Sequence, residues 1–87
     1  MNDKLANFKV TDRDSFAIFL DLLLKDFKEN PKEWENKSLE DFLEALSRYT
    51  EDIQGYYDNM KMNIDANKPD WKIFADIFMG ARISVQV

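Results

Sequence analysis

The sequence predicts an all-α fold, a compact bundle of three main helices at about residues 12–29, 39–54 and 70–83. Three observations predict it. Apolar residues recur at spacings of three and four along each of these stretches. Helix-capping residues and helix breakers stand at their ends. The 87 residues include only two Gly and two Pro, so few positions interrupt a helix.

The length and composition limit the chain to one domain. Eighty-seven residues, of which 45% are hydrophobic, suffice for one modest core. We therefore expect a single helical domain over residues 1–87, with residues 1–10 and 84–87 weakly ordered. Apolar and polar residues alternate weakly at 8–10 and 83–87, so a minor pairing of terminal strands is an alternative there, although an isolated pair is marginal.

The first helix is predicted by one apolar stripe. Its members are Phe16, Phe19, Leu20, Leu23 and Phe27. Thr11, with Asp14 three residues later, supplies an acceptor and an acidic group that favour a helix start. Ile18 and Leu22 lie on the far side of this helix. We expect a terminal segment to cover them, and the alternative is a small exposed apolar strip.

The junction after the first helix ends one helix and begins another. Pro31 cannot continue a helix, because it lacks the N–H group and blocks the preceding turn. Trp34 is expected to plug an open end of the core, with a recognition anchor as the alternative. Ser38, with Asp41 three residues later, caps the second helix. Gly55 is expected to end that helix, because glycine adopts positive φ without strain.

The third helix follows a long connection. Residues 57–69 form a link longer than most within compact domains. Pro69 and Asp70 then open a helix that is apolar around most of its circumference, so it should be the central one. Its remaining residues, Lys72, Asp76 and Gly80, are expected to form a narrow strip that faces outward.

The composition excludes most kinds of catalytic and metal-binding site. The chain has no His and no Cys, which excludes the usual nucleophilic triads and the usual zinc or copper ligands. A phosphate-binding loop is excluded by the scarcity of glycine. Carboxylates one helical turn apart, Glu40 with Glu44 or Asp41 with Glu44, are the remaining acid–base candidates, but on an exposed helix they form a solvated face. We expect no catalytic residue, no metal, no cofactor and no enzymatic activity.

The charge favours a basic partner. The chain carries 17 acidic and 12 basic residues, a net charge of −5 that would repel nucleic acid and anionic membranes. The absence of Cys, of a signal-peptide pattern and of a run of about 20 apolar residues predicts a cytoplasmic protein.

Several short motifs carry a resemblance. They are Asn-Pro at 30–31, Trp-Glu-Asn at 34–36, Ser-Leu-x-x-Phe-Leu at 38–43, Gly-Tyr-Tyr at 55–57 and Trp-x-x-Phe-Ala-Asp-Ile at 71–77. Together they resemble a small, mainly helical bacterial domain family of unknown function, over about residues 16–83. The resemblance implies a compact bacterial cytoplasmic domain and brings no catalytic residues with it.

The resulting hypothesis is a protein-interaction domain. Its candidate contact residues are Glu40, Glu44, Glu51, Asp52, Tyr56 and Tyr57. The acids would steer a basic partner and one of the tyrosines would anchor it. An immunity-like or antitoxin-like inhibitor is one concrete version; the colicin immunity proteins are similar in size, acidity and helical character, although this chain lacks their Asp-Gly-Thr-Asp segment. The alternative is an accessory or ligand-sensing subunit that binds a small apolar molecule under the 57–69 connection.

Overall fold

The computed structural model describes residues 3–83, all of whose regular structure is helical. Its elements are α1 (Asp3–Asn7), α2 (Arg13–Glu29), the 3-10 turn η1 (Pro31–Glu33), α3 (Leu39–Asn59) and α4 (Trp71–Ala81). The all-α prediction is confirmed, and α2, α3 and α4 are its three main helices. Residues 8–10 form no strand, and residues 84–87, the other half of the strand-pairing alternative, lie outside the described part.

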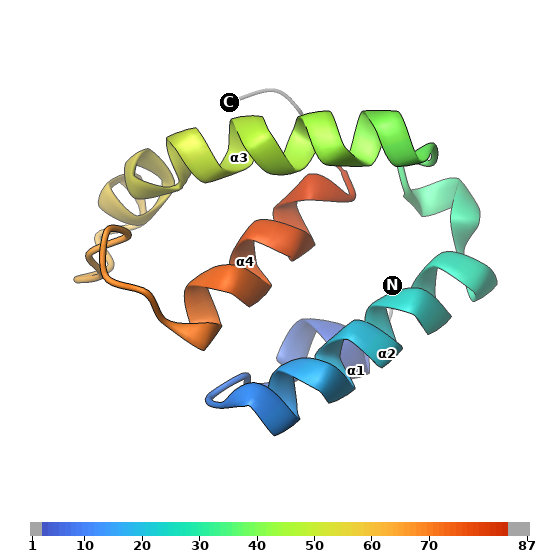
Figure 1. Cartoon of the computed structure of the whole chain (residues 1–87), viewed down its shortest axis with the longest axis horizontal. Coiled ribbons are helices and arrows are strands. Elements are labelled where there is room, and N and C mark those ends of the chain that lie inside the picture. Colours follow the sequence, from blue (N-terminus) through green and yellow to red (C-terminus); the bar gives the residue numbers. More distant parts are fainter. Residues whose placement is uncertain (1–2, 84–87) are drawn as a thin grey trace.

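Helix α4 lies at the centre of the molecule, as its apolar circumference predicts. It packs against α3 on one side and α2 on the other, while α1 packs against α2 (Figure 1). Two clusters of buried side chains form the core. The larger cluster contains Leu5, Val10, Phe19, Leu23, Trp34 and Ala75. The smaller one contains Ile53, Tyr57 and Ile73, so α4 contributes to both.

Side-chain caps fix where the main helices begin. Asp12 Oδ1 accepts a hydrogen bond from the Ser15 backbone N–H at 2.8 Å, and Ser15 Oγ accepts one from the Asp12 N–H at 3.0 Å. This reciprocal pair lies one residue after the predicted cap at Thr11. The hydrogen bond from the Ser15 backbone lowers the pKa of the Asp12 carboxyl. Ser38 Oγ accepts from the Asp41 N–H at 3.0 Å, as predicted.

Helix α3 is longer than predicted, because Gly55 does not end it. The helix continues to Asn59, and the left-handed residue after it is Lys61, with φ of 57°. Tyr57 is fully buried against Ile73 of α4, and this burial outweighs the roughly 1 kcal/mol that an interior glycine costs a helix. The connection between α3 and α4 therefore begins only after Asn59.

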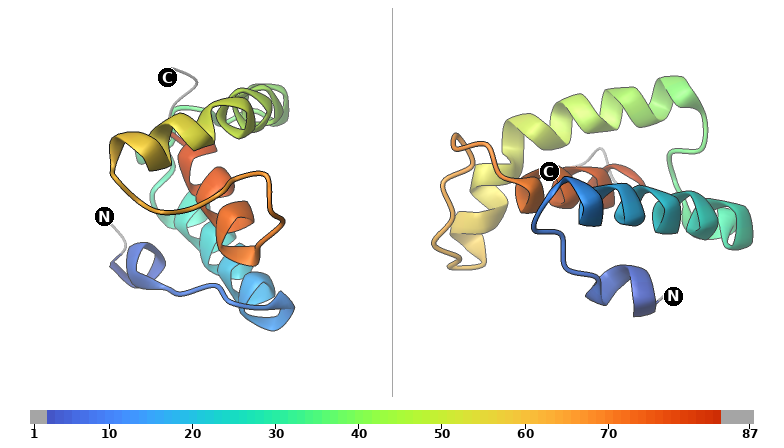
Figure 2. Two further views of the ribbon diagram at one scale, coloured as in Figure 1. Left: turned by 90° about the vertical axis from the view of Figure 1, so that its left-hand side faces the viewer. Right: turned by 60° about the horizontal axis from the view of Figure 1, so that its bottom comes forward.

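The connection packs onto the core. Met62, Ile64 and Ala66 lie against the cluster formed by α3 and α4. The Gln54 side chain holds this segment, since its Nε2 donates to the Ile64 carbonyl at 2.9 Å and its Oε1 accepts from the Ala66 N–H at 2.8 Å. Figure 2 shows the last part of α3 bent away from the axis of its first part. Thr50 Oγ1 donates to the Leu46 carbonyl at 2.6 Å, a contact that bends helices.

The N-terminal segment takes part in the core. Residues 3–10, which the sequence suggests are weakly ordered, contain α1 and place Leu5 and Val10 among the buried side chains. Leu22 packs half-buried against this cluster, whereas Ile18 is exposed. The terminal segment therefore helps to cover only one of the two far-side residues of α2.

Helices α3 and α4 approach each other closely at Gly80. The glycine is buried, and a Cβ there would overlap the ring of Tyr49. The prediction that Gly80 faces outward is therefore wrong, because the Tyr49 ring occupies the space above it. Asp76 of the same strip is half-buried and accepts hydrogen bonds at 2.7 Å from both Tyr57 Oη and Lys72 Nζ.

Candidate protein-interaction surface

Three of the four predicted acids share one face of α3. Glu40, Glu44 and Glu51 are all exposed and, at 3.6 residues per turn, lie within about 40° of one another around the helix. Asp52 is exposed but lies about 80° from Glu44, on the side away from α2. We call Glu40, Glu44 and Glu51 the acidic face.

The two predicted tyrosines occupy different environments. Tyr57 is 0% exposed, so of the two alternative anchors Tyr57 is not available to a partner. Burial, together with its hydrogen bond to Asp76, raises the pKa of the Tyr57 phenol well above its ordinary value. Tyr56 is 43% exposed and remains available for contacts, although it lies on a different side of α3 from the acidic face.

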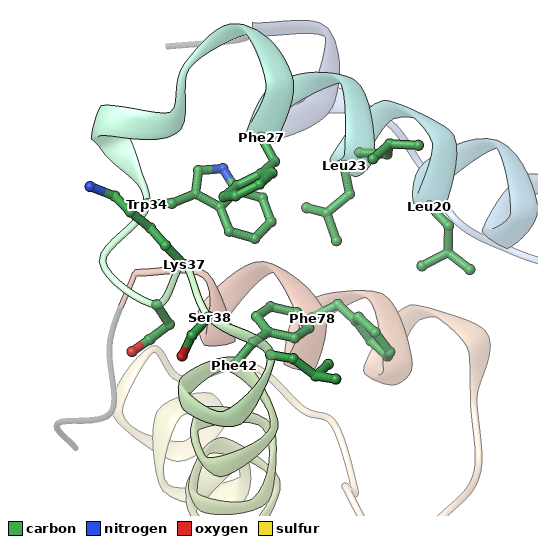
Figure 3. Close-up of a pocket in the computed structure, with 11 residues that line it drawn as sticks. Leu20, Leu23, Phe27, Trp34, Lys37, Ser38, Phe42 and Phe78 are labelled. Carbon is green, nitrogen blue, oxygen red and sulfur yellow. The ribbon is translucent and has the colours of Figure 1, made fainter.

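An apolar hollow of about 380 Å³ lies beside the start of α3. Leucine and phenylalanine side chains of α2 face those of α3 and α4 across it (Figure 3). Its apolar lining consists of Leu20, Leu23, Leu24, Phe27, Trp34, Leu39, Phe42 and Phe78. Asn36, Lys37 and Ser38 add polar groups at the end nearest the junction.

A second hollow of about 360 Å³ adjoins the first. It is lined by Phe16, Leu46, Thr50, Phe74, Ile77 and Phe78. Phe78 of α4 lines both hollows, which therefore lie next to each other on the surface with this side chain as a shared wall. We call the two together the apolar groove. Sequence reasoning missed it, because its lining comes from three helices whose arrangement no local pattern reveals.

The acidic face adjoins one wall of this groove. Leu39 lines the groove and is 74% exposed; Leu43, the next apolar residue around α3, is 53% exposed. At 100° per residue Leu43 lies between Leu39 and Glu40, so the apolar surface runs directly into the acidic one. Along α2, beyond Leu20 and Leu24, the exposed charges are mixed in sign: Arg13, Asp21 and Lys28.

A buried polar cluster supports the closed end of the groove. The Asp26 carboxylate accepts a hydrogen bond from Trp34 Nε1 at 2.9 Å and one from Asn30 Nδ2 at 3.3 Å. Arg82 Nη1 lies 3.7 Å from the same carboxylate, and both charged residues are buried. Trp34 is itself buried, as predicted for a core plug, and its ring packs against Phe27 and Phe42. These contacts fix the indole that forms the end wall.

The residues after Trp34 cap the end of α4. The backbone N–H of Glu35 donates to the Arg82 carbonyl at 3.0 Å, and Asn36 Nδ2 donates to the Ala81 carbonyl at 2.8 Å. The final carbonyls of a helix have no partner within the helix, so these bonds satisfy groups that would otherwise be left buried and unpaired. The junction thus joins α2, α3 and α4 at one corner.

Neither a cluster of metal-ligand residues nor a membrane-spanning helix is present in the part of the chain that the structure describes. Among residues 3–83, no group of three or more His, Cys, Asp or Glu side chains is arranged to hold a metal ion. No helix in this part of the chain is long and apolar enough to cross a bilayer.

Comparison with known proteins gives one match. The sequence model of DUF7660, a family of unknown function, matches residues 12–84. No curated protein and no solved structure matches the chain. The matched region contains α2, α3 and α4, and therefore includes both the acidic face and the apolar groove.

Proposed function

The chain belongs to the DUF7660 family of unknown function, and we propose from its own surfaces that it is a non-enzymatic protein-interaction domain that binds a basic partner. The observation that carries the proposal is the acidic face, where Glu40, Glu44 and Glu51 are exposed along one side of the same helix. In a chain of net charge −5, such a face attracts a basic surface and orients its approach.

An immunity-like or antitoxin-like inhibitor of a bacterial, cytoplasmic protein is the concrete form we favour. Such an inhibitor needs a rigid surface that covers basic residues of its target. Helix α3 supplies one, since it packs on α4 along its inner side while its acids face solvent. Tyr56, rather than the buried Tyr57, is the tyrosine that supports an anchoring contact.

Binding of a small apolar molecule is the second candidate function. The 57–69 connection gives it little support, because Met62, Ile64 and Ala66 of that connection pack onto the core. The feature that favours it is the apolar groove, whose first hollow of about 380 Å³ lies within the usual range for ligand sites.

Charge reversal on the acidic face tests the proposed function. The protein carrying Glu44→Lys and Glu51→Lys is compared with the protein carrying Asp21→Lys and Glu29→Lys, two exposed acids of α2. Both pairs raise the net charge from −5 to −1. Each protein is used to capture partners from a lysate of the native cells, and association with the captured protein is then followed at low and high salt.

We expect the unaltered protein to capture a basic protein and to associate with it more slowly as salt increases. The α3 reversal should slow association at low salt by about tenfold or more, whereas the α2 reversal should have a much smaller effect. Equal effects of the two reversals, or association that is independent of salt, would remove the proposed role of the acidic face.

A further inference from the structure

We propose that the apolar groove binds the apolar side of an amphipathic α-helix belonging to the basic partner, with the basic residues of that helix lying along α3. This inference rests on the proposed function and specifies what the partner presents.

Five of the large apolar side chains that are exposed in residues 3–83 lie around the groove. Those that line it or border it and are exposed are Leu20, Leu24, Leu39, Leu43 and Phe74. Isolated exposed leucines are common on monomers, but a contiguous group around a hollow marks a binding surface. These five surround or adjoin two neighbouring hollows that share Phe78 as a wall, so they lie around one stretch of the surface.

The lining favours a helix over an extended peptide. Helices α2, α3 and α4 supply most of it, the junction before α3 supplies the rest, and residues 3–83 contain no strand edge to which an extended backbone could bond. An occupant must therefore satisfy its own backbone N–H and C=O groups, as a helix does. The wall formed by α3 runs from Leu39 to Thr50, which corresponds to about 16 Å or three helical turns. An occupant with apolar residues at i, i+3 or i+4, and i+7 matches this length.

The charges on the two walls set the orientation of the occupant. Beyond Leu43 the α3 wall presents Glu40, Glu44 and Glu51, with the exposed base Arg48 one turn after Glu44, and is acidic on balance. Helix α2 exposes acidic and basic residues in equal numbers. A helix seated in the groove with Lys or Arg on one flank gains complementary contacts only when that flank lies along α3. The buried Asp26–Trp34 hydrogen bond fixes the closed end of the groove before binding, which lowers the ordering cost.

A displayed peptide library tests this inference. Helix-forming peptides of about 14 residues, four turns, are selected on the whole protein. Counter-selection uses the protein carrying Leu24→Glu and Leu39→Glu. Both leucines are exposed, so the fold should tolerate the changes, and the added negative charge would strengthen any purely electrostatic attraction of basic peptides. Weaker binding to this protein therefore reports lost apolar contact. Ile18→Glu with Met60→Glu, exposed apolar residues outside the groove, is the matched control.

We expect the enriched peptides to carry an apolar stripe with Lys or Arg along one flank. The best of them should bind the Leu24→Glu, Leu39→Glu protein about tenfold or more weakly than the unaltered protein, and bind the control equally well. Failure to enrich any peptide, enrichment without basic residues, or equal binding to the two double variants would overturn the inference. So would self-association that the groove substitutions abolish, or an apolar small molecule retained in the groove of the purified protein.

The two proposals fail separately. If capture of the natural partner is lost on charge reversal but survives Leu24→Glu with Leu39→Glu, the groove inference falls and the proposed function stands. If the captured partner is insensitive to charge reversal, the proposed function falls, and the requirement for a basic helix falls with it.

Discussion

At the scale of single residues, the Asp26 carboxylate links α2 to the end of α4. It accepts the Trp34 indole N–H and lies opposite the buried Arg82 guanidinium. Both charged residues are buried, so the attraction between them must offset the free energy that each loses on leaving water. The corner at which α2, the junction and α4 meet therefore depends on a pair separated by most of the chain.

Removing the Asp26 carboxylate should be severely destabilising. Asp26→Ala leaves the buried Arg82 charge and the Trp34 N–H without their partner, and we expect a loss of about 3–5 kcal/mol in the free energy of unfolding. Urea unfolding followed by circular dichroism measures it. The double substitution Asp26→Leu with Arg82→Met removes both charges and should be less destabilising than Asp26→Ala alone. A loss below about 1 kcal/mol for Asp26→Ala would show that the pair contributes little.

Tyr57 should make the fold sensitive to alkali. Because its pKa is raised in the folded chain, the unfolded chain loses the phenolic proton first as pH rises above about 10. Stability is therefore complete below that pH and falls above it, by up to about 1.4 kcal/mol per pH unit. Tyr49, whose pKa is also raised by burial, contributes with the same sign.

The substitution Tyr57→Phe tests this dependence. Urea unfolding at about pH 9 and about pH 11 should show a smaller decline for Tyr57→Phe than for the unaltered chain, whatever its stability at neutral pH. Tyr56→Phe, at an exposed position, is the control and should keep the decline. An unchanged decline in Tyr57→Phe would assign the alkaline sensitivity to other groups.

At the scale of helices, the two glycines serve different purposes. Gly55 lies in an exposed part of α3, where an added Cβ would meet no atom within 4 Å, whereas Gly80 of α4 is covered by Tyr49. Gly55→Ala should stabilise the fold by about 0.5–1 kcal/mol, because alanine loses less backbone entropy in a helix. Gly80→Ala should destabilise it by about 1–3 kcal/mol through overpacking against Tyr49.

Thermal unfolding of the two variants separates packing from helix propensity. Both glycines are helical, so the propensity gain is similar and the difference between the variants reports the contact with Tyr49. If Gly80→Ala stabilised the protein as much as Gly55→Ala, the close approach of α3 and α4 at this position would be relaxed at little cost.

Helix beginnings were easier to predict than helix ends. Ser38 bonds to Asp41 only three residues away, so this start is encoded locally. The end of α3 is different, because it depends on Tyr57 meeting Ile73 of another helix. The burial of Asp26 had one sign in the sequence, because this acid follows Leu23 by three residues and so lies on the inward side of α2. Its partner could not be predicted, because Arg82 is distant in sequence.

At the scale of the whole molecule, one part of the candidate site could be predicted from the sequence and the other could not. The acids of α3 could be predicted, because charged residues on the outer positions of an amphipathic helix are exposed in almost any packing. The groove could not, since Leu24, Leu39 and Phe78 become neighbours only when three helices are placed around one another. The choice between Tyr56 and Tyr57 as anchor has the same tertiary cause, because Tyr57 is buried by Ile73 of another helix.

The acidic face and the groove should act on different rate constants of partner binding. Charges attract before contact, so Glu44→Lys with Glu51→Lys should mainly lower the association rate, and this loss should shrink as salt screens the field. Apolar contacts form only in the complex, so Leu24→Glu with Leu39→Glu should mainly raise the dissociation rate, with little dependence on salt. Surface plasmon resonance with the captured partner at two salt concentrations measures both constants. If both double variants changed only the dissociation rate, the acids would act as contacts rather than in steering, and the partner's basic residues would be expected to touch them directly.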